Sequence, residues 1–327
     1  MQENPLVSLL MPVYNSPDLF RALESVRCQT YRPLQFIIID DGSETFEEEK
    51  IRDFFSNAGD GFGLYILRNE HNLGTVCTLN RGLAIAKGKY YFNLASDDAF
   101  FDNKVLSDWV TAFEQIDCDV LTARRAICDS QLESILEILP SEKAITMIEQ
   151  STHEDLFEYL SKENHISGSC TAWRMQALRR LGLFDESYCV LEDHPAYLKL
   201  LRHGGSICFF DRTVVRYRSG GISSKHSCIS PRLERDFIQM YQKEILPYVR
   251  SPFIARCRLF FWHQGVCFDR RYYLELGSAN LVKRTLLQLQ YYAHHPTRLI
   301  RKKTDYAGNN TVIRGVLSCR NQSSEKT

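Results

Sequence analysis

The sequence has no net charge, no clustered cysteines and no long apolar run. Its 40 Lys and Arg balance 40 Asp and Glu, so no global positive field favours a nucleic acid as partner. No stretch reaches the roughly 18 to 20 apolar residues that a membrane-spanning helix needs. Residues 1–5 are polar and do not resemble the start of a signal peptide. These absences favour a cytoplasmic protein that does not cross a membrane.

The eleven cysteines are scattered singly along the chain. The closest pairs, Cys118 with Cys128 and Cys257 with Cys267, have nine residues between them, so no Cys-x-x-Cys spacing for a metal or redox centre occurs. Because the number is odd and no signal peptide is evident, we expect reduced thiols that fill the core, with no disulfide framework.

What the sequence does contain is three apolar runs that each end in polar residues. Residues 7–11 lead into Pro12-Val13-Tyr14-Asn15, residues 36–39 into Asp40-Asp41-Gly42-Ser43, and residues 90–95 into Ser96-Asp97-Asp98. Ligands of α/β proteins bind at the carboxyl ends of the strands. The three runs therefore predict one rim of a sheet that carries acidic and polar side chains.

The order of apolar runs and helical segments predicts the fold class. Strands and helices alternate over the first hundred residues, which is typical of an α/β fold with a mostly parallel central sheet. The expected strands are 7–11, 34–39, 64–67, 90–95, 207–210 and 214–217, and the expected helices are 46–55, 74–88, 103–116, 175–181 and 192–201, with another beginning at Ser16-Pro17. Residues 119–152 are less regular and contain an excursion at 129–140.

From the sequence we expect an α/β domain at 1–230, a helical and basic region at 231–308, and a polar tail at 309–327 that we predict to be flexible. Residues 251–303 carry ten Lys or Arg against two acidic residues, interleaved with aromatic residues. This composition suits contact with an anionic membrane surface. Solvated helix faces around an aromatic core would explain the same residues, and both interpretations stay open.

Taken together and in order, the motifs resemble those of a family 2 inverting glycosyltransferase with the GT-A nucleotide-sugar-binding fold, of the bacterial polysaccharide or glycolipid type. The matching segments lie within residues 6–218 and are Val7 to Asn15, Ser25 with Gln29-Thr30-Tyr31, Asp40 to Ser43, Asn72-Leu73-Gly74, Asn80-Arg81-Gly82, Ala86-Lys87-Gly88, Ser96-Asp97-Asp98, Gly182 to Asp185, and Glu192-Asp193.

The resemblance implies a role for each group of polar residues at the rim. Asp41 would contact the nucleobase of the donor. The other residues that it assigns to the nucleotide-sugar site are Pro12, Tyr14, Asn15, Asn72, Asn80, Asp97 and Arg218. Asp40 and Asp41 could instead only cap the turn before Gly42. Arg216 and Arg218 could fold over the diphosphate as a lid, or be ordinary surface arginines.

The resemblance also implies a metal site and a catalytic base. Asp97 and Asp98 would hold Mn²⁺ or Mg²⁺ on the diphosphate, although Ala95 stands where the family commonly has a first aspartate, and a helix cap is the alternative. Asp193, supported by Glu192, would be the base. Pro195 just inside the predicted helix places this pair near a helix N-terminus, where capping alone would also explain an aspartate. His194 is a second possible base by its ordinary pKa.

The expected function is transfer of a sugar from a nucleotide-diphosphate donor to a carbohydrate or lipid-linked acceptor, with inversion at the anomeric carbon. Among such donors we expect a UDP-sugar. The alternative is a sugar-nucleotide-binding module without catalysis, which Ala95 supports. A nucleotidyltransferase is disfavoured, because no glycine-rich phosphate loop with a lysine follows the first strand. The expected location is the cytoplasm, with peripheral contact at the inner face of the membrane.

Overall fold

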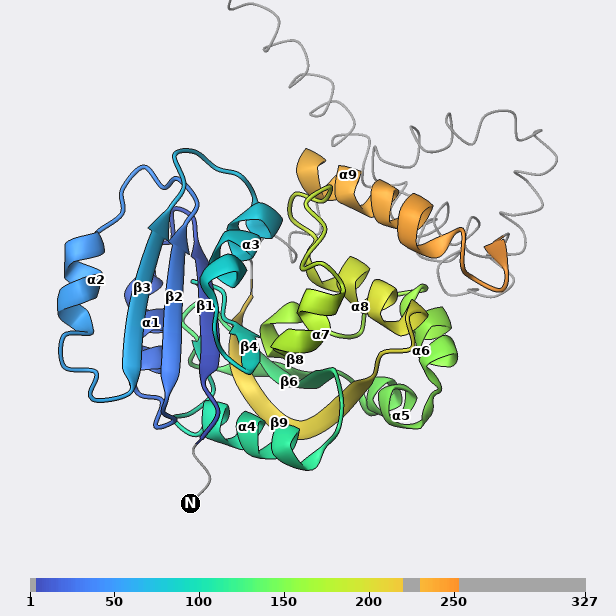
Figure 1. Ribbon diagram of the computed structural model, residues 1–327, viewed down its shortest axis with the longest axis horizontal. Coiled ribbons are helices and arrows are strands. Elements are labelled where there is room, and N and C mark those ends of the chain that lie inside the picture. The colour runs from blue at the N-terminus through green and yellow to red at the C-terminus, as the bar shows by residue number, and fades with distance from the viewer. Residues whose placement is uncertain (1–3, 220–229, 253–327) are drawn as a thin grey trace, which may run out of the picture. The chain divides into compact units, whose positions relative to one another are not determined.

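The computed structural model describes residues 4–219 and 230–252, which form an α/β unit (Figure 1). Within these residues a nine-stranded sheet has the order β3-β2-β1-β4-β8-β6-β9-β5, and β7 pairs with β6. The strands are β1 (Val7–Val13), β2 (Leu34–Asp40), β3 (Phe62–Arg68), β4 (Tyr90–Asn93), β5 (Ala99–Phe100), β6 (Val120–Cys128), β7 (Ile135–Leu139), β8 (Thr171–Arg174) and β9 (Ile207–Arg218). The helices are α1 (Leu19–Arg27), α2 (Glu48–Phe54), α3 (Thr75–Ile85), α4 (Val105–Gln115), α5 (Glu142–Gln150), α6 (His153–Leu160), α7 (Met175–Arg180), α8 (Asp193–Arg202) and α9 (Pro231–Met240), with a 3₁₀ turn η1 (Gly168–Cys170) and a π-helical turn η2 (Tyr241–Ile245).

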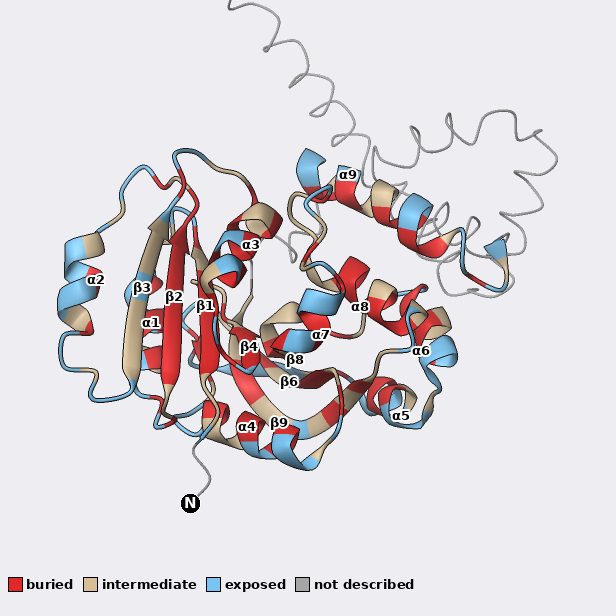
Figure 2. Cartoon of the chain, in the orientation of Figure 1, coloured by how far each residue is buried: buried red, intermediate tan, exposed pale blue. Residues whose placement is uncertain are grey.

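The first half of the sheet is the parallel part that the sequence predicts. β1 lies between β2 and β4, β2 also pairs with β3, and all these pairings are parallel. β2 is buried along its whole length, as expected for a strand covered on both faces (Figure 2). Val13 pairs with Asp40, and Asp40 with Arg68. The loops after β1, β2 and β3 therefore leave the sheet at the same edge.

The second half of the sheet contains the antiparallel pairings. β8 runs antiparallel to both β4 and β6, and so joins the parallel half to β6 and β9. The irregular middle of the sequence is the β6–β7 hairpin followed by α5 and α6, and the excursion at 129–140 is the turn of that hairpin with β7.

β9 is one continuous strand, whereas the sequence suggested two short ones. The register against β6 shifts between Ala123 and Arg125, where Asp211 and Arg212 form extra length in β9. Arg124 Nε lies 2.6 Å from an Asp211 carboxylate oxygen. Asp211 and Arg212 interrupt the apolar pattern of β9, but they lie in a bulge, and a bulge bends a strand without ending it.

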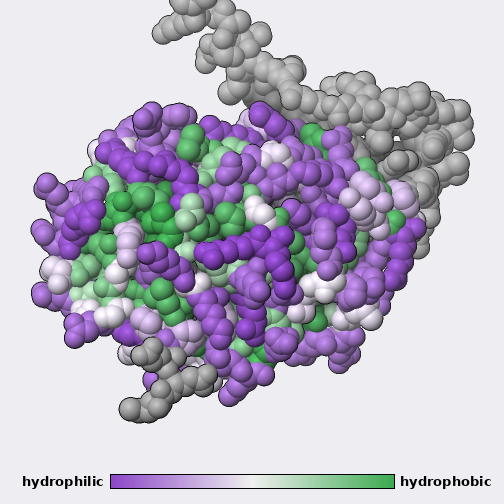
Figure 3. Space-filling view, viewed as in Figure 1, coloured by the Kyte–Doolittle hydropathy of each residue, from purple (hydrophilic) through white to green (hydrophobic). Residues whose placement is uncertain are grey.

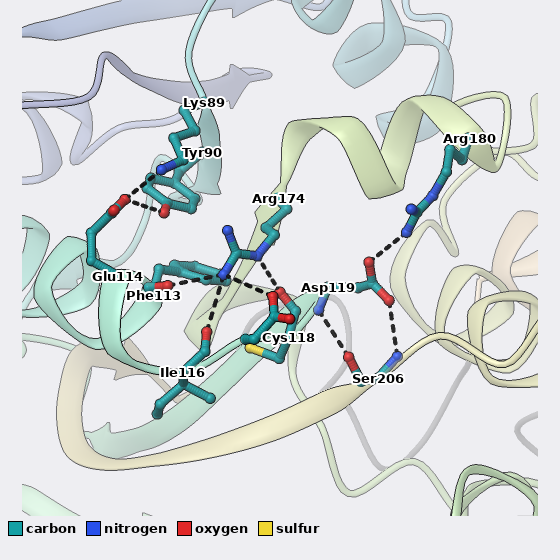
Figure 4. A network of polar contacts seen from close by, with 11 residues as sticks. Lys89, Tyr90, Phe113, Glu114, Ile116, Cys118, Asp119, Arg174, Arg180 and Ser206 are labelled. Atoms are coloured by element: carbon teal, nitrogen blue, oxygen red, sulfur yellow. Dashed lines mark hydrogen bonds and ion pairs between the residues drawn. The ribbon is translucent and has the colours of Figure 1, made fainter.

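At the end of the sheet opposite to the rim, Arg174 closes the C-terminus of α4 (Figure 4). Its guanidinium donates to the carbonyl oxygens of Phe113 (3.0 Å), Ile116 (3.1 Å) and Cys118 (2.6 Å). Carbonyls in the last turn of a helix have no partner inside that helix, and a cation there also favours the helix dipole. This contact ties α4 to β8.

Hydrophobic surface gathers over β2 and β3 in Figure 3, and Tyr65 on β3 is 44% exposed. No helix among the described residues is long and apolar enough to cross a membrane.

The predicted boundary at residue 230 falls inside the unit that runs to Ala255, since α9 and η2 bond to α8 and to the segment before it. The basic region beyond residue 252 and the tail at 309–327 lie outside the described residues.

Candidate active site

The loops after β1 and β2 are joined by hydrogen bonds beside an exposed ring. Asn15 N donates to Ser43 Oγ (2.9 Å), and Glu44 N donates to Asn15 Oδ1 (3.0 Å). Asn15 has a φ of 45°, a left-handed conformation that Asn tolerates better than most residues. Tyr14 is 52% exposed, and Pro12 is partly buried at the end of β1. Pro12, Tyr14, Asn15, Ser43 and Glu44 together form a preorganised surface, here called the ledge, on which the ring of Tyr14 is exposed.

Asp41 is a buried carboxylate that accepts hydrogen bonds on both of its oxygens. It is 5% exposed and accepts from Asn69 Nδ2 (2.7 Å), Leu73 N (2.8 Å) and Gly74 N (3.0 Å). Asp40 meanwhile accepts from Ser43 N (3.1 Å) and so makes the turn cap. Asp41 thus fixes the loop that leads into α3.

Gly74 at the start of α3 occupies a position that no other residue fits easily. Its φ is 91°, and an added Cβ would lie 2.5 Å from the carbonyl oxygen of Cys189. The loop after β3 is therefore in close contact with the segment just before Glu192. This contact joins the two halves of the rim.

The two asparagines assigned to the donor lie in different settings. Asn72 contacts Arg232 of α9 through its side-chain oxygen. Asn80 is buried; its amide donates to Phe184 O (2.8 Å) and accepts from Phe184 N (3.2 Å). Asn80 therefore links α3 to the segment around Phe184. A donor contact of either asparagine stays a prediction.

Asp97 and Asp98 lie in the turn between β4 and β5. Asp98 N donates to Ala95 O (3.1 Å), and Asp98 is 1% exposed. Asp98 Oδ1 accepts from Arg218 N (2.9 Å), but Oδ2 has no hydrogen-bond partner among the described residues. Burial, together with the charge of Asp97, raises the pKa of Asp98 to about 8. A buried carboxylate oxygen without a partner fits a cation ligand.

Arg218, at the end of β9, lies beside this acidic turn. Its Nε donates to Asp97 O (3.1 Å), and another guanidinium nitrogen lies 2.5 Å from Asp18. Ser16 Oγ donates to Ser96 O (3.1 Å), which brings the loop after β1 to the same place. Arg216 instead stacks over Phe101 at 4.8 Å. Arg218 thus bonds to the acidic turn, whereas Arg216 pairs with Ala99, the first residue of β5.

Glu192 and Asp193 form the second acidic pair, at the start of α8. Asp193 Oδ2 accepts from Gly168 N (3.0 Å) and Oδ1 from His194 N (2.6 Å). Burial and the neighbouring Asp193 raise the pKa of Glu192 to about 8, and burial raises the pKa of Asp193. Aromatic residues Tyr91, Trp173 and Tyr197 line a small pocket with this pair.

The surroundings of His194 do not suit a catalytic base. It is 4% exposed, and its Nε2 lies 2.9 Å from Leu160 O. Burial lowers its pKa to about 4, so it is neutral and structural at physiological pH. The alternative base that the sequence left open is therefore disfavoured by its surroundings.

Arg125 on β6 is the site residue that sequence reasoning missed. Its guanidinium stacks over Tyr217 at 4.5 Å and donates to Ser167 Oγ. Its positive charge opposes the rise that burial causes in the pKa of both Asp98 and Asp193, so it lies within electrostatic range of both acidic pairs. The available signal was the pair Arg124-Arg125 inside an otherwise apolar strand.

The sequence profile described as "Glycosyl transferase family 2" matches residues 8–182, which is more than half of the chain. The chain belongs to glycosyl transferase family 2. An uncharacterized glycosyltransferase of Rickettsia typhi is 28% identical over 216 residues, which cover 65% of this chain and 63% of that relative. The match thus spans slightly less than two thirds of the relative. The putative colanic acid biosynthesis glycosyl transferase WcaA of Escherichia coli is 27% identical over 205 residues, which cover 62% of this chain and 68% of WcaA.

Solved structures establish the fold of this chain. TarS of S. aureus in complex with UDP-GlcNAc superimposes with a TM-score of 0.58 and 19% identity, over 85% of this chain and 77% of TarS. The mannosyltransferase PcManGT from Pyrobaculum calidifontis, in complex with GDP-Man and Mn²⁺, gives a TM-score of 0.57 and 14% identity, over 93% and 85% of the two chains. The predicted GT-A fold is confirmed.

Proposed function

We propose that this glycosyltransferase moves a sugar from a nucleotide-diphosphate donor, UDP-linked by preference, to a hydroxyl of a carbohydrate or lipid-linked acceptor, and inverts the anomeric carbon. The observation that carries the proposal is the pair of acidic sites: Asp97-Asp98 after β4 and Glu192-Asp193 at α8, with Arg125 in electrostatic range of both. The donors named with TarS and PcManGT support a nucleotide sugar, and WcaA supports a role in surface polysaccharide assembly.

The donor nucleoside would lie on the ledge after β1 and β2. Tyr14 offers an exposed ring on which a base can stack, and the bonds of Asn15 fix the ledge in advance. Asp41 would contribute through the loop that it holds. A direct hydrogen bond from the base would use the lone pair of the carboxylate that its three donors do not occupy. Preorganisation of this kind lowers the entropy cost of binding.

Asp97 and Asp98 would hold Mn²⁺ or Mg²⁺. The unpartnered Oδ2 of Asp98 fits a hard cation. No group of three or more His, Cys, Asp or Glu suited to a metal occurs in the part of the chain that the structure describes, so phosphate oxygens and water would complete the coordination. When bound, the cation supplies charge neutralisation at the departing diphosphate. Arg218 would add a positive group beside it.

Asp193 would take the proton from the acceptor hydroxyl. The acceptor oxygen then bonds to the anomeric carbon from the face opposite the diphosphate, and the bond from that carbon to the diphosphate oxygen breaks. Amide donors from Gly168 and His194 orient the carboxylate and favour its ionised form. Glu192, whose raised pKa favours the protonated form, would avoid a second negative charge beside the base.

Turnover of a panel of UDP- and GDP-sugars by the purified chain with Mn²⁺ tests this function. Nucleotide binding without hydrolysis or transfer of any donor would favour the alternative, a binding module without catalysis. We also propose a cytoplasmic location with peripheral membrane contact through residues 251–303, which lie almost entirely outside the described residues. Flotation with anionic liposomes at low salt decides that point, and a chain that stays unbound would refute it.

A further inference from the structure

A carboxylate from α9 holds the backbone directly before the acidic pair. Asp236 is 2% exposed and accepts hydrogen bonds from three consecutive backbone amides. Its Oδ2 accepts from Cys189 N (2.9 Å), Val190 N (2.6 Å) and Leu191 N (3.0 Å), and Oδ1 also lies 3.1 Å from Cys189 N. The next residues in the chain are Glu192 and Asp193.

Three successive N–H groups that point to one place form a concave anion-binding site. The N-terminus of α8 follows directly, and its dipole also favours a negative charge there. In the described structure this place is filled by a side chain that lies 45 to 47 residues further along the chain. The bonds therefore join α9 to the backbone that carries the proposed base.

The same segment is held from its other side by α3. Cys189 O accepts from Val76 N (3.2 Å), and Gly74 leaves no room for a Cβ against that oxygen. Gly74 N in turn donates to Asp41. Residues 189–191 thus lie between the helix that Asp41 anchors and the helix that carries Asp236, and they cannot shift without breaking bonds on one side.

We propose that Asp236 is a positioning residue for the transfer step: by fixing residues 189–191 it orients the Asp193 carboxylate toward the acceptor hydroxyl. The proposal rests on the proposed function of Asp193. A base that is misplaced by about 1 Å can lower the rate about 10²-fold, because proton transfer needs a narrow range of geometry. Asp236 lies beyond residues 8–182, where the family profile matches, so the profile does not assign it.

Asp236→Asn in the full chain tests the proposal. The amide keeps the size of the side chain and one acceptor oxygen, but its NH₂ group faces at least one backbone N–H and cannot accept from it. We expect kcat to fall about 10- to 100-fold while the KM for the donor and the affinity for UDP stay within about twofold. Hydrogen exchange at the amides of residues 189–191 should accelerate about tenfold or more.

Asp185→Asn is the matched control. Asp185 accepts from Ser187 N (3.0 Å) and pairs with Lys243 of η2, so it joins the same two parts of the chain without touching residues 189–191. This variant should keep kcat within about twofold and leave exchange at 189–191 unchanged. Asp236→Glu, which keeps the charge but adds one methylene, covers the case that the Asn variant does not fold. It should also lower kcat at constant donor KM.

The results separate this proposal from the proposed function. A wild-type kcat in both Asp236 variants, or exchange at 189–191 that does not change, would overturn the positioning role. So would a loss of donor binding equal to the loss of kcat, because that pattern indicates general damage to the fold. If the wild-type chain transfers no sugar, the proposed function fails and the positioning role fails with it, whereas the exchange measurement still decides whether Asp236 clamps the segment.

Discussion

The carboxylates on the two sides of the rim differ in their hydrogen bonding and in their pKa values. Asp41, on the parallel side, receives hydrogen bonds from one side-chain amide and two backbone amides. Asp98 and Glu192, toward the antiparallel side, are each next to another acid, and burial raises the pKa of each to about 8. Asp41 is satisfied by the fold, whereas the fold does little to stabilise the ionised forms of Asp98 and Glu192. That difference distinguishes Asp41 from the groups to which the proposed function assigns a cation, a diphosphate and a proton.

The largest expected effect comes from Asp193→Asn, which removes basicity but keeps size and most hydrogen bonds. Sugar transfer should fall about 10² to 10⁴-fold, the usual contribution of a positioned general base. UDP affinity, measured by calorimetry, should stay near the wild-type value. Glu192→Gln should lower transfer less. An Asp193→Asn enzyme with wild-type activity would remove the base assignment and direct attention to Glu192.

The next effect concerns Asp98, whose partnerless oxygen marks the difference from Asp41. Asp98→Asn should lower transfer about 10²-fold or more, because charge on the departing diphosphate loses its compensation. The metal-free variant should melt no lower than the wild type, since the amide replaces a buried carboxyl whose ionised form the fold stabilises poorly. Asp102→Asn is the control: Asp102 pairs with Arg212 at 2.8 Å and should tolerate the change. Full wild-type activity in the presence of a chelator would exclude the metal from the mechanism.

The smallest effect is on stability, through Glu192. Its pKa is about 8 in the folded chain and about 4.3 when unfolded. The folded state therefore binds more protons between these values, so this group lowers stability as the pH rises from about 4 to about 8. Glu192→Gln removes that loss, and its melting temperature should exceed that of the wild type by more at pH 8 than at pH 5. A difference for Glu192→Gln that stays constant from pH 5 to pH 8 would contradict the raised pKa.

The parallel side could be predicted from the sequence because its signals are local. β1, β2 and β4 are short apolar runs, and polar residues follow each of them closely, so the rim was evident from strand ends alone. The GT-A fold followed from the order of these motifs. The helix at residues 46–55 was predicted too long, because α2 begins only at Glu48.

The other side depends on contacts between residues far apart in the chain. The link from Asn80 to Phe184 joins residues 104 positions apart and cannot be read from spacing. Arg125 comes to the site only through the pairing of β6 with β9, whose bulge also hid the continuity of β9. Asp236 is likewise joined to residues 189–191 by tertiary structure. Local patterns identify the acids, but only the fold shows which of them remain without compensation.

The most direct test of the account follows the anomeric configuration during turnover. With an α-linked UDP-sugar that the chain uses, Mn²⁺ and an acceptor, proton NMR should show a β-linked product from the first points of the time course, and Asp193→Asn should abolish that signal while UDP still binds. An α-linked product would contradict the single displacement by an acceptor that Asp193 deprotonates.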